Sequence, residues 1–154
     1  MRTRSATHDT FTIERRYPVS PARVFAAFAD PAKKARWFGC APEWVVTEQT
    51  MDFRVGGREV WRVGPPGGTE HRNDTVYHDI VPNERIVWSY AMQLDERRIS
   101  VSLSTVELQA DGNGTRLVFT EQGVFLDGYD GAEDRVHGTG EGLDSLGRWL
   151  AEEG

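Results

Sequence analysis

The chain has 154 residues and a formal net charge of −6 at pH 7. This length suits one domain with a continuous core and is short for two, and the negative charge disfavours binding to nucleic acid or to anionic membrane surfaces. The one cysteine, Cys40, excludes an internal disulfide and a zinc site of paired cysteines, and because no run of eighteen apolar residues predicts a membrane span, we expect a cytoplasmic protein.

The first elements follow from polarity and alternation. Residues 1–9 are polar and predict a flexible leader, which leaves a single domain over residues 10–153. Alternation of apolar and polar side chains over residues 11–16 predicts the first strand.

Two helix starts come next. Ser20-Pro21 and Asp30-Pro31 each place a capping side chain before a proline at the first helical position, where a missing N–H costs nothing. Two short helices are therefore expected, the second ending at Gly39.

The middle of the chain alternates with a period of two residues, separated by turn signals. The clearest turn is Asp111-Gly112-Asn113-Gly114, whose residues tolerate the left-handed backbone conformation of tight hairpins. This pattern predicts six further strands, over residues 44–53, 58–63, 75–81, 86–91, 99–108 and 115–125.

The last third changes to a helical period. Apolar side chains recur at helical spacing from about residue 132 to Leu150, which predicts one amphipathic C-terminal helix. Its four glycines, each costing about 1 kcal/mol against alanine in an exposed helix interior, indicate a mixture of a late helix start and close approach to the sheet. The element order predicts an α+β domain in which a curved antiparallel sheet of six to seven strands packs on this helix.

Several segments in this order resemble a known family. They are VSPARVFAAF (19–28), DP and WF (30–38), DFRVGGR (52–58), IVPNERIVW (80–88), TRL with TEQG (115–123) and GT with GL (138–143). Together they resemble the SRPBCC (START-like) superfamily, and within it bacterial proteins similar to the C-terminal domain of the activator of the heat-shock chaperone ATPase. The resemblance implies a helix-grip (START/Bet v 1-like) fold with a cavity for small apolar molecules, and it implies no particular reaction.

Aromatic side chains are the main candidates for a cavity wall. Five tryptophans, four tyrosines and seven phenylalanines are many for a small sheet protein. Each one alone is more simply explained as core, and a slip of one residue reverses the face that a strand presents. The predicted ligand-binding residues are Trp37, Phe53, Trp61, Tyr77, Trp88, Tyr90 and Phe119, with Tyr77 or Thr139 as a polar contact.

Catalytic and metal sites find little support. The four histidines show no four-residue helical pairing, so neither a metal nor another cofactor is expected. Asp79 and Glu84 flank a turn and are better explained as solvated residues or as a partner for Arg85. No nucleophile-elbow serine occurs, and Cys40 has no adjacent histidine.

Three functions stay open at this stage. The leading hypothesis is binding of a small apolar ligand, lipid-, polyketide- or aromatic-like, in an internal cavity. A cyclase- or hydrolase-type enzyme of the same fold is the main alternative, and a titratable side chain in the cavity favours it. A module that binds the chaperone ATPase is the third, and an exposed apolar patch favours it. The sequence leaves the ligand's identity open, and also the choice between a monomer and a homodimer.

Overall fold

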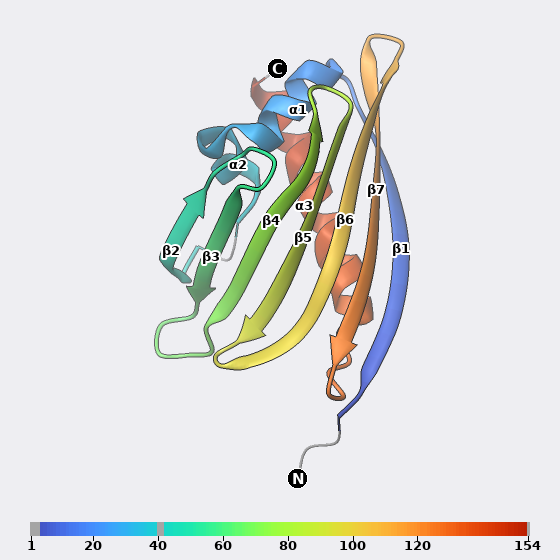
Figure 1. Ribbon diagram of the computed structural model, residues 1–154. Coiled ribbons are helices and arrows are strands. Elements are labelled where there is room, and N and C mark those ends of the chain that lie inside the picture. Colours follow the sequence, from blue (N-terminus) through green and yellow to red (C-terminus); the bar gives the residue numbers. More distant parts are fainter. Residues whose placement is uncertain (1–3, 40–41, 154) are drawn as a thin grey trace.

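In residues 4–39 and 42–153, which this computed structural model describes, seven antiparallel strands form one curved sheet around a long C-terminal helix (Figure 1). The strands lie in the order β1-β7-β6-β5-β4-β3-β2. The elements are β1 (Ala6–Tyr17), α1 (Pro21–Ala29), α2 (Pro31–Trp37), β2 (Val45–Met51), β3 (Arg58–Gly64), β4 (His71–Val81), β5 (Arg85–Leu94), β6 (Arg97–Asp111), β7 (Gly114–Leu126) and α3 (Ala132–Glu153). The predicted α+β helix-grip fold is confirmed.

The two short helices begin where their capping signals predict. The Ser20 hydroxyl accepts a hydrogen bond from the Arg23 backbone N–H at 3.3 Å, and the Asp30 carboxylate accepts one from the Ala32 N–H at 2.9 Å. In both helices a proline occupies the first turn. Because each cap depends on residues within three positions of it, local sequence is enough to place α1 and α2.

The first strand is longer than predicted. It begins at Ala6, which pairs with Leu126 of β7, so residues 6–9 belong to the sheet and not to a leader. Their side chains are exposed, so no apolar alternation marks them, and the pairing is made by the backbone. Residues 1–3 and Cys40 lie outside the described residues, and so do the predictions made for them.

Helix α3 lies in the curve of the sheet and packs closely against β1. The Tyr17 hydroxyl donates to the Leu143 backbone carbonyl at 2.8 Å. A Cβ on Gly147 would lie 3.1 Å from the Tyr17 ring, and one on Gly140 would lie 3.3 Å from Nη2 of Arg15. The helix starts at Ala132, before all four of its glycines, so the predicted late start is wrong. Two of the glycines lie in close contact with β1, as predicted.

The solid core occupies the end of the sheet beneath α1. Its members include side chains that are fully or almost fully buried, among them Val24, Val106, Leu117, Leu146 and Leu150. Toward the other end, α3 diverges from β3, β4 and β5 (Figure 1). A cavity remains among the side chains in this region. None of the described helices is both long and apolar enough to cross a membrane.

Candidate ligand-binding cavity

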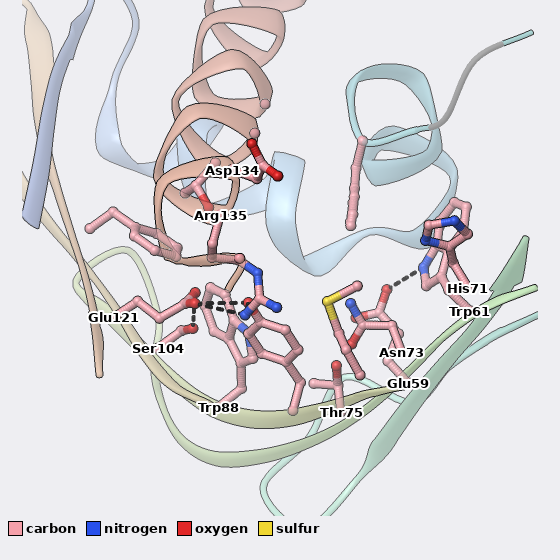
Figure 2. A pocket seen from close by; sticks show the side chains of 18 of the residues that line it. Glu59, Trp61, His71, Asn73, Thr75, Trp88, Ser104, Glu121, Asp134 and Arg135 are labelled. Carbon is pink, nitrogen blue, oxygen red and sulfur yellow. Dashed lines mark hydrogen bonds and ion pairs between the residues drawn. The ribbon is translucent and has the colours of Figure 1, made fainter. Parts of the chain in front are cut away.

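A cavity of about 410 Å³ lies between the inner face of the sheet and helices α2 and α3 (Figure 2). A volume of this size falls in the range of small-molecule sites. Its wall combines aromatic and aliphatic side chains with a smaller number of polar ones. The lining residues are Phe28, Lys34, Trp37, Phe38, Glu59, Trp61, His71, Asn73, Thr75, Trp88, Tyr90, Met92, Leu94, Ile99, Ser104, Phe119, Glu121, Tyr129, Gly131, Asp134, Arg135, Gly138, Thr139, Gly142 and Leu143.

Aromatic rings from several elements pack edge to face or in stacks along the wall. Trp88 of β5 meets Phe119 of β7 edge-on, with ring centroids 5.9 Å apart. Phe38 stacks on Trp61 of β3 at 5.2 Å and on Trp37 of α2 at 6.0 Å. Rings held by one another in this way keep their positions without a ligand, which favours a preformed apolar surface.

The glycines of α3 that do not touch β1 face this space. Gly138 and Gly142 both line the cavity, and a Cβ built on either would meet nothing within 4 Å. Larger side chains at these two positions would occupy the cavity. The absence of side chains at these two positions of the helix is therefore one reason why the interior stays open.

A buried ionic cluster forms one end of the wall. The Glu121 side chain, only 3% exposed, pairs with Arg135 of α3 at 3.3 Å. Glu121 also accepts a hydrogen bond from the Ser104 hydroxyl at 3.0 Å (Figure 2). It accepts another from the Tyr90 hydroxyl at 2.9 Å. Three donors compensate this carboxylate, as a buried charge requires.

Arg135 is held as firmly as its partner. Its guanidinium donates to the hydroxyls of Ser100, Ser102 and Tyr90 at 2.8, 3.2 and 2.9 Å. It also lies over the rings of Tyr90 and Phe125, 5.4 and 5.2 Å from their centroids. Burial, and then the charge of the nearby carboxylate, raise the pKa of Tyr90, so this phenol keeps its proton and remains a donor.

A second buried carboxylate lies on the opposite side, on β3. Glu59 pairs with Lys34 of α2 at 2.7 Å and accepts a hydrogen bond from the Trp61 indole N–H at 2.9 Å. The Tyr77 hydroxyl donates to the same carboxylate. Burial and the charge of Glu59 raise the pKa of Tyr77, so this phenol also stays protonated.

Six of the eight predicted ligand-binding residues come together in the cavity wall. They are Trp37, Trp61, Trp88, Tyr90, Phe119 and Thr139. They come from α2, β3, β5, β7 and α3, as expected for elements that curl around one space. Their location is a finding, whereas a role in binding a ligand stays a prediction.

Phe53 and Tyr77 do not line the cavity. The two rings pack edge to face at 4.9 Å, and Phe53 also meets the Phe25 ring of α1 at 5.8 Å. Tyr77 is 3% exposed and turns its hydroxyl to Glu59. Both lie in the solid core beneath α1, because Phe53 follows the end of β2 and Tyr77 lies farther along β4 than the cavity reaches.

The polar groups of the wall were not predicted. Glu121 follows Leu117 and Phe119 at the inward positions of β7, and Glu59 shares an inward face with Trp61. A glutamate in an otherwise apolar inward row is the sequence signal that marks such a site. Arg135 carries a weaker signal, since it lies four residues before Thr139 on one face of α3.

The remaining polar candidates behave as ordinary surface groups. Asp79 pairs with Arg85 at 2.6 Å, which confirms the simpler interpretation of that turn. His137 pairs with Glu141 on the exposed side of α3. Within the described part of the chain, no group of three or more His, Cys, Asp or Glu side chains is placed to hold a metal ion.

A curved antiparallel sheet that grips a C-terminal helix around an internal cavity defines the class of helix-grip proteins. Residues 18–152 match the family described as activator of Hsp90 ATPase homolog 1-like protein. The chain belongs to this family, which is part of the SRPBCC superfamily.

Solved structures agree with this assignment, whereas no curated protein matches. A protein from Rhizobium leguminosarum shares 47% identity and a TM-score of 0.92, with 97% of this chain and 99% of that chain covered. The Mll3558 protein from Rhizobium loti shares 50% identity and a TM-score of 0.89, covering 94% and 99%. The CV1439 protein from Chromobacterium violaceum shares 26% identity and a TM-score of 0.75, covering 92% and 96%.

Proposed function

We propose that the protein binds one small, largely apolar molecule inside the cavity between the sheet and α3. The observation that carries this proposal is the combination of an unfilled volume of about 410 Å³ with a preformed aromatic wall. Burying apolar ligand surface there stabilises the complex by about 25 cal/mol per Å² before the costs of association are subtracted.

The charged groups of the wall favour a ligand-binding site over the alternative that the cavity is a packing defect. Glu59 and Glu121 each accept three hydrogen bonds from protein groups, so the two carboxylates are compensated when the cavity is empty. These two carboxylates of the wall thus need no ligand to satisfy them. An apolar molecule can enter without leaving a buried charge unpaired.

A thermal-shift screen with fatty acids, polyketides and flavonoids tests the proposal, because a ligand that binds only the native state raises the melting temperature. At a ligand concentration one hundred times Kd the stabilisation is about 2.7 kcal/mol. We expect at least one apolar class to give a saturable shift. If no compound of these classes shifts the transition, the proposal fails.

A matched pair of variants shows whether the ligand lies inside. Gly142→Leu places a side chain into the cavity, whereas Glu141→Leu places the same side chain on the exposed side of α3, where the Glu141 side chain is 70% exposed. We expect the ligand-induced shift to disappear in the first variant and to persist in the second. A shift that persists in Gly142→Leu contradicts internal binding.

An enzyme of the cyclase or hydrolase type is the second candidate. It is favoured by the two carboxylates in the wall, Glu59 and Glu121, which are titratable groups facing a cavity. Mass spectrometry of each ligand after incubation with the protein tests for conversion. Conversion that is lost in Glu121→Gln supports catalysis, whereas ligands recovered unchanged support binding alone.

A module that interacts with the chaperone ATPase is the third candidate, and it concerns a different surface. Val101 and Leu103 are 40% and 39% exposed on the outer face of β6. Two neighbouring apolar side chains on a sheet face are the kind of feature that a partner protein contacts. ATPase assays of purified Hsp90 with the wild-type protein and with Leu103→Lys test this candidate, which predicts stimulation by the first and not by the second.

A further inference from the structure

Glu59, Glu121 and their cations are hydrogen-bonded within the two carboxylate clusters described above, whereas several other polar side chains of the cavity wall belong to neither cluster. The side chains that the structure leaves without a hydrogen bond in the wall include Asn73 and Thr75, two residues apart on the inward face of β4. Figure 2 shows both on the sheet side of the cavity, between Glu59 and Trp88.

The neighbours of Asn73 in the sheet leave its side chain without a hydrogen-bond partner among the described residues. It lies opposite Trp61 of β3 and Met92 of β5. The Trp61 indole N–H already donates to Glu59, and Met92 offers only a thioether. The Oδ1 atom of Asn73 is buried and without a hydrogen bond in the described residues, and of the atoms with this property it is the one whose residue lines the cavity. An unpaired buried amide oxygen is costly, and a donor supplied by a ligand removes the cost.

Thr75 extends the same polar row. It lies opposite Glu59 on one side and Tyr90 on the other, and both of these are engaged with other groups. Its hydroxyl can both donate and accept. The floor of the cavity therefore offers one neutral amide and one neutral hydroxyl side by side.

The charges of the wall make an anionic ligand unfavourable. Lys34 and Arg135 are the cations of the wall, and each already pairs with a buried carboxylate. Asp134 lines the cavity as well, and no ion pair joins it to any residue in 4–39 or 42–153. Asp134 is exposed and its charge is screened by solvent, so the main obstacle to a carboxylate ligand is that both cations, Lys34 and Arg135, are already paired.

On these grounds we propose that the amide of Asn73, assisted by Thr75, recognises a hydroxyl group on a neutral ligand. The inference rests on the proposed function and narrows its ligand class to apolar molecules that carry a hydroxyl group. Carboxylates, and ethers in which the hydroxyl is methylated, should bind less tightly. A turn of the amide about its last side-chain bond exchanges Oδ1 and Nδ2, so Oδ1 can face the cavity when a donor is present.

Two pairs of probes test the inference in binding titrations followed by tryptophan fluorescence. In the first pair, 7-hydroxyflavone and 7-methoxyflavone differ in the hydrogen-bond donor, and they are compared at mildly acidic pH because conjugation with the ring carbonyl makes the 7-hydroxyl more acidic than an ordinary phenol. In the second, 1-dodecanol and dodecanoate differ in charge. We expect the hydroxyl member of each pair to bind about tenfold more tightly, since a buried acceptor left unpaired costs a factor of this order.

Variants then assign the preference to Asn73. Asn73→Leu removes the amide and keeps the branching and the number of heavy atoms of the side chain, and the affinity ratio between 7-hydroxyflavone and 7-methoxyflavone should fall to about one. The matched control is Gln93→Leu, an amide on β5 that does not line the cavity, in which the ratio should stay as in the wild type. If Asn73→Leu does not fold, Asn73→Ala serves the same purpose.

The outcomes separate the two proposals. Binding without a hydroxyl preference in the wild type, or a preference that survives in the Asn73 variant, overturns the inference and leaves the proposed function standing. Failure of all four probes to bind overturns the proposed function and the inference with it. A preference that is lost only in the Asn73 variant supports both.

Discussion

The pair of Glu121 and Arg135 gives the sharpest test of how the cavity wall is held. Replacing Arg135 by methionine keeps an unbranched apolar stem and removes the charge and the donors of the guanidinium. The Glu121 side chain is 3% exposed, so its carboxylate would stay buried without its cation. Removing one partner of a buried pair costs about 3–5 kcal/mol, and this is the loss that we expect in the free energy of unfolding.

The double variant Glu121→Gln with Arg135→Met separates this cost from ordinary loss of packing. Because no unpaired charge remains in the double variant, its loss should be smaller than the sum of the two single losses by about 2 kcal/mol. Urea unfolding curves, analysed with one common slope of free energy against urea concentration, give the free energy of unfolding. The four proteins compared are the wild type, the two single variants and the double variant. Arg148→Met, at an exposed position of the same helix, is the control and should change stability by less than about 0.5 kcal/mol.

Two results would refute this reasoning. The first is a loss of less than about 1 kcal/mol in Arg135→Met, which would show that Glu121 finds water or another partner. The second is additivity of the two single losses within about 0.5 kcal/mol, which would show that the two side chains act independently.

Three further predictions follow from neighbouring contacts. Burial, and then the charge of Glu121, raise the pKa of Tyr90 above its ordinary value of 10.0, so the folded state binds this proton more tightly than the unfolded chain. The resulting stabilisation is present in full below pH 10 and is lost as the pH rises further. Tyr90→Phe should therefore reduce the alkaline slope in urea titrations by up to about 1.4 kcal/mol per pH unit, and an equal slope in both proteins counts against it. Gly138→Ala should raise the free energy of unfolding by up to about 1 kcal/mol, because its Cβ meets open space, whereas Gly147→Ala should lower it, because its Cβ would lie 3.1 Å from a buried tyrosine ring. Thermal melts in which both alanines act in the same direction would contradict the packing of α3. Trp88→Ala should weaken ligand uptake and cost less than the roughly 3–5 kcal/mol of a fully buried aromatic, since one side of the ring faces the cavity. A full loss of stability with unchanged uptake would place Trp88 in the core.

The parts of the fold that the sequence predicts are those that depend on near neighbours. The caps at Ser20 and Asp30 depend only on the next three residues, and most strands are predicted by the alternation of apolar and polar side chains. Residues 6–9 are different, because their side chains are exposed and they are held by pairing with β7, more than one hundred residues away. No local pattern contains that information.

The candidate site divides in the same way. Aromatic residues such as Trp88 and Phe119 can be chosen from composition and alternation, but the end of the sheet at which the cavity lies cannot. Phe53 and Tyr77 were therefore assigned to the wall although they belong to the core beneath α1. The partners of Glu121 come from β5, β6 and α3. Such a cluster becomes visible only when those elements are placed together.

The most direct test of the central claim is to locate a bound ligand by nuclear Overhauser contacts between 7-hydroxyflavone and the isotope-labelled protein. Internal binding predicts contacts from the ligand to Trp88, Phe119 and Thr139, which line the cavity from β5, β7 and α3. Contacts confined to Val101 and Leu103 on the outer face of the sheet would contradict it.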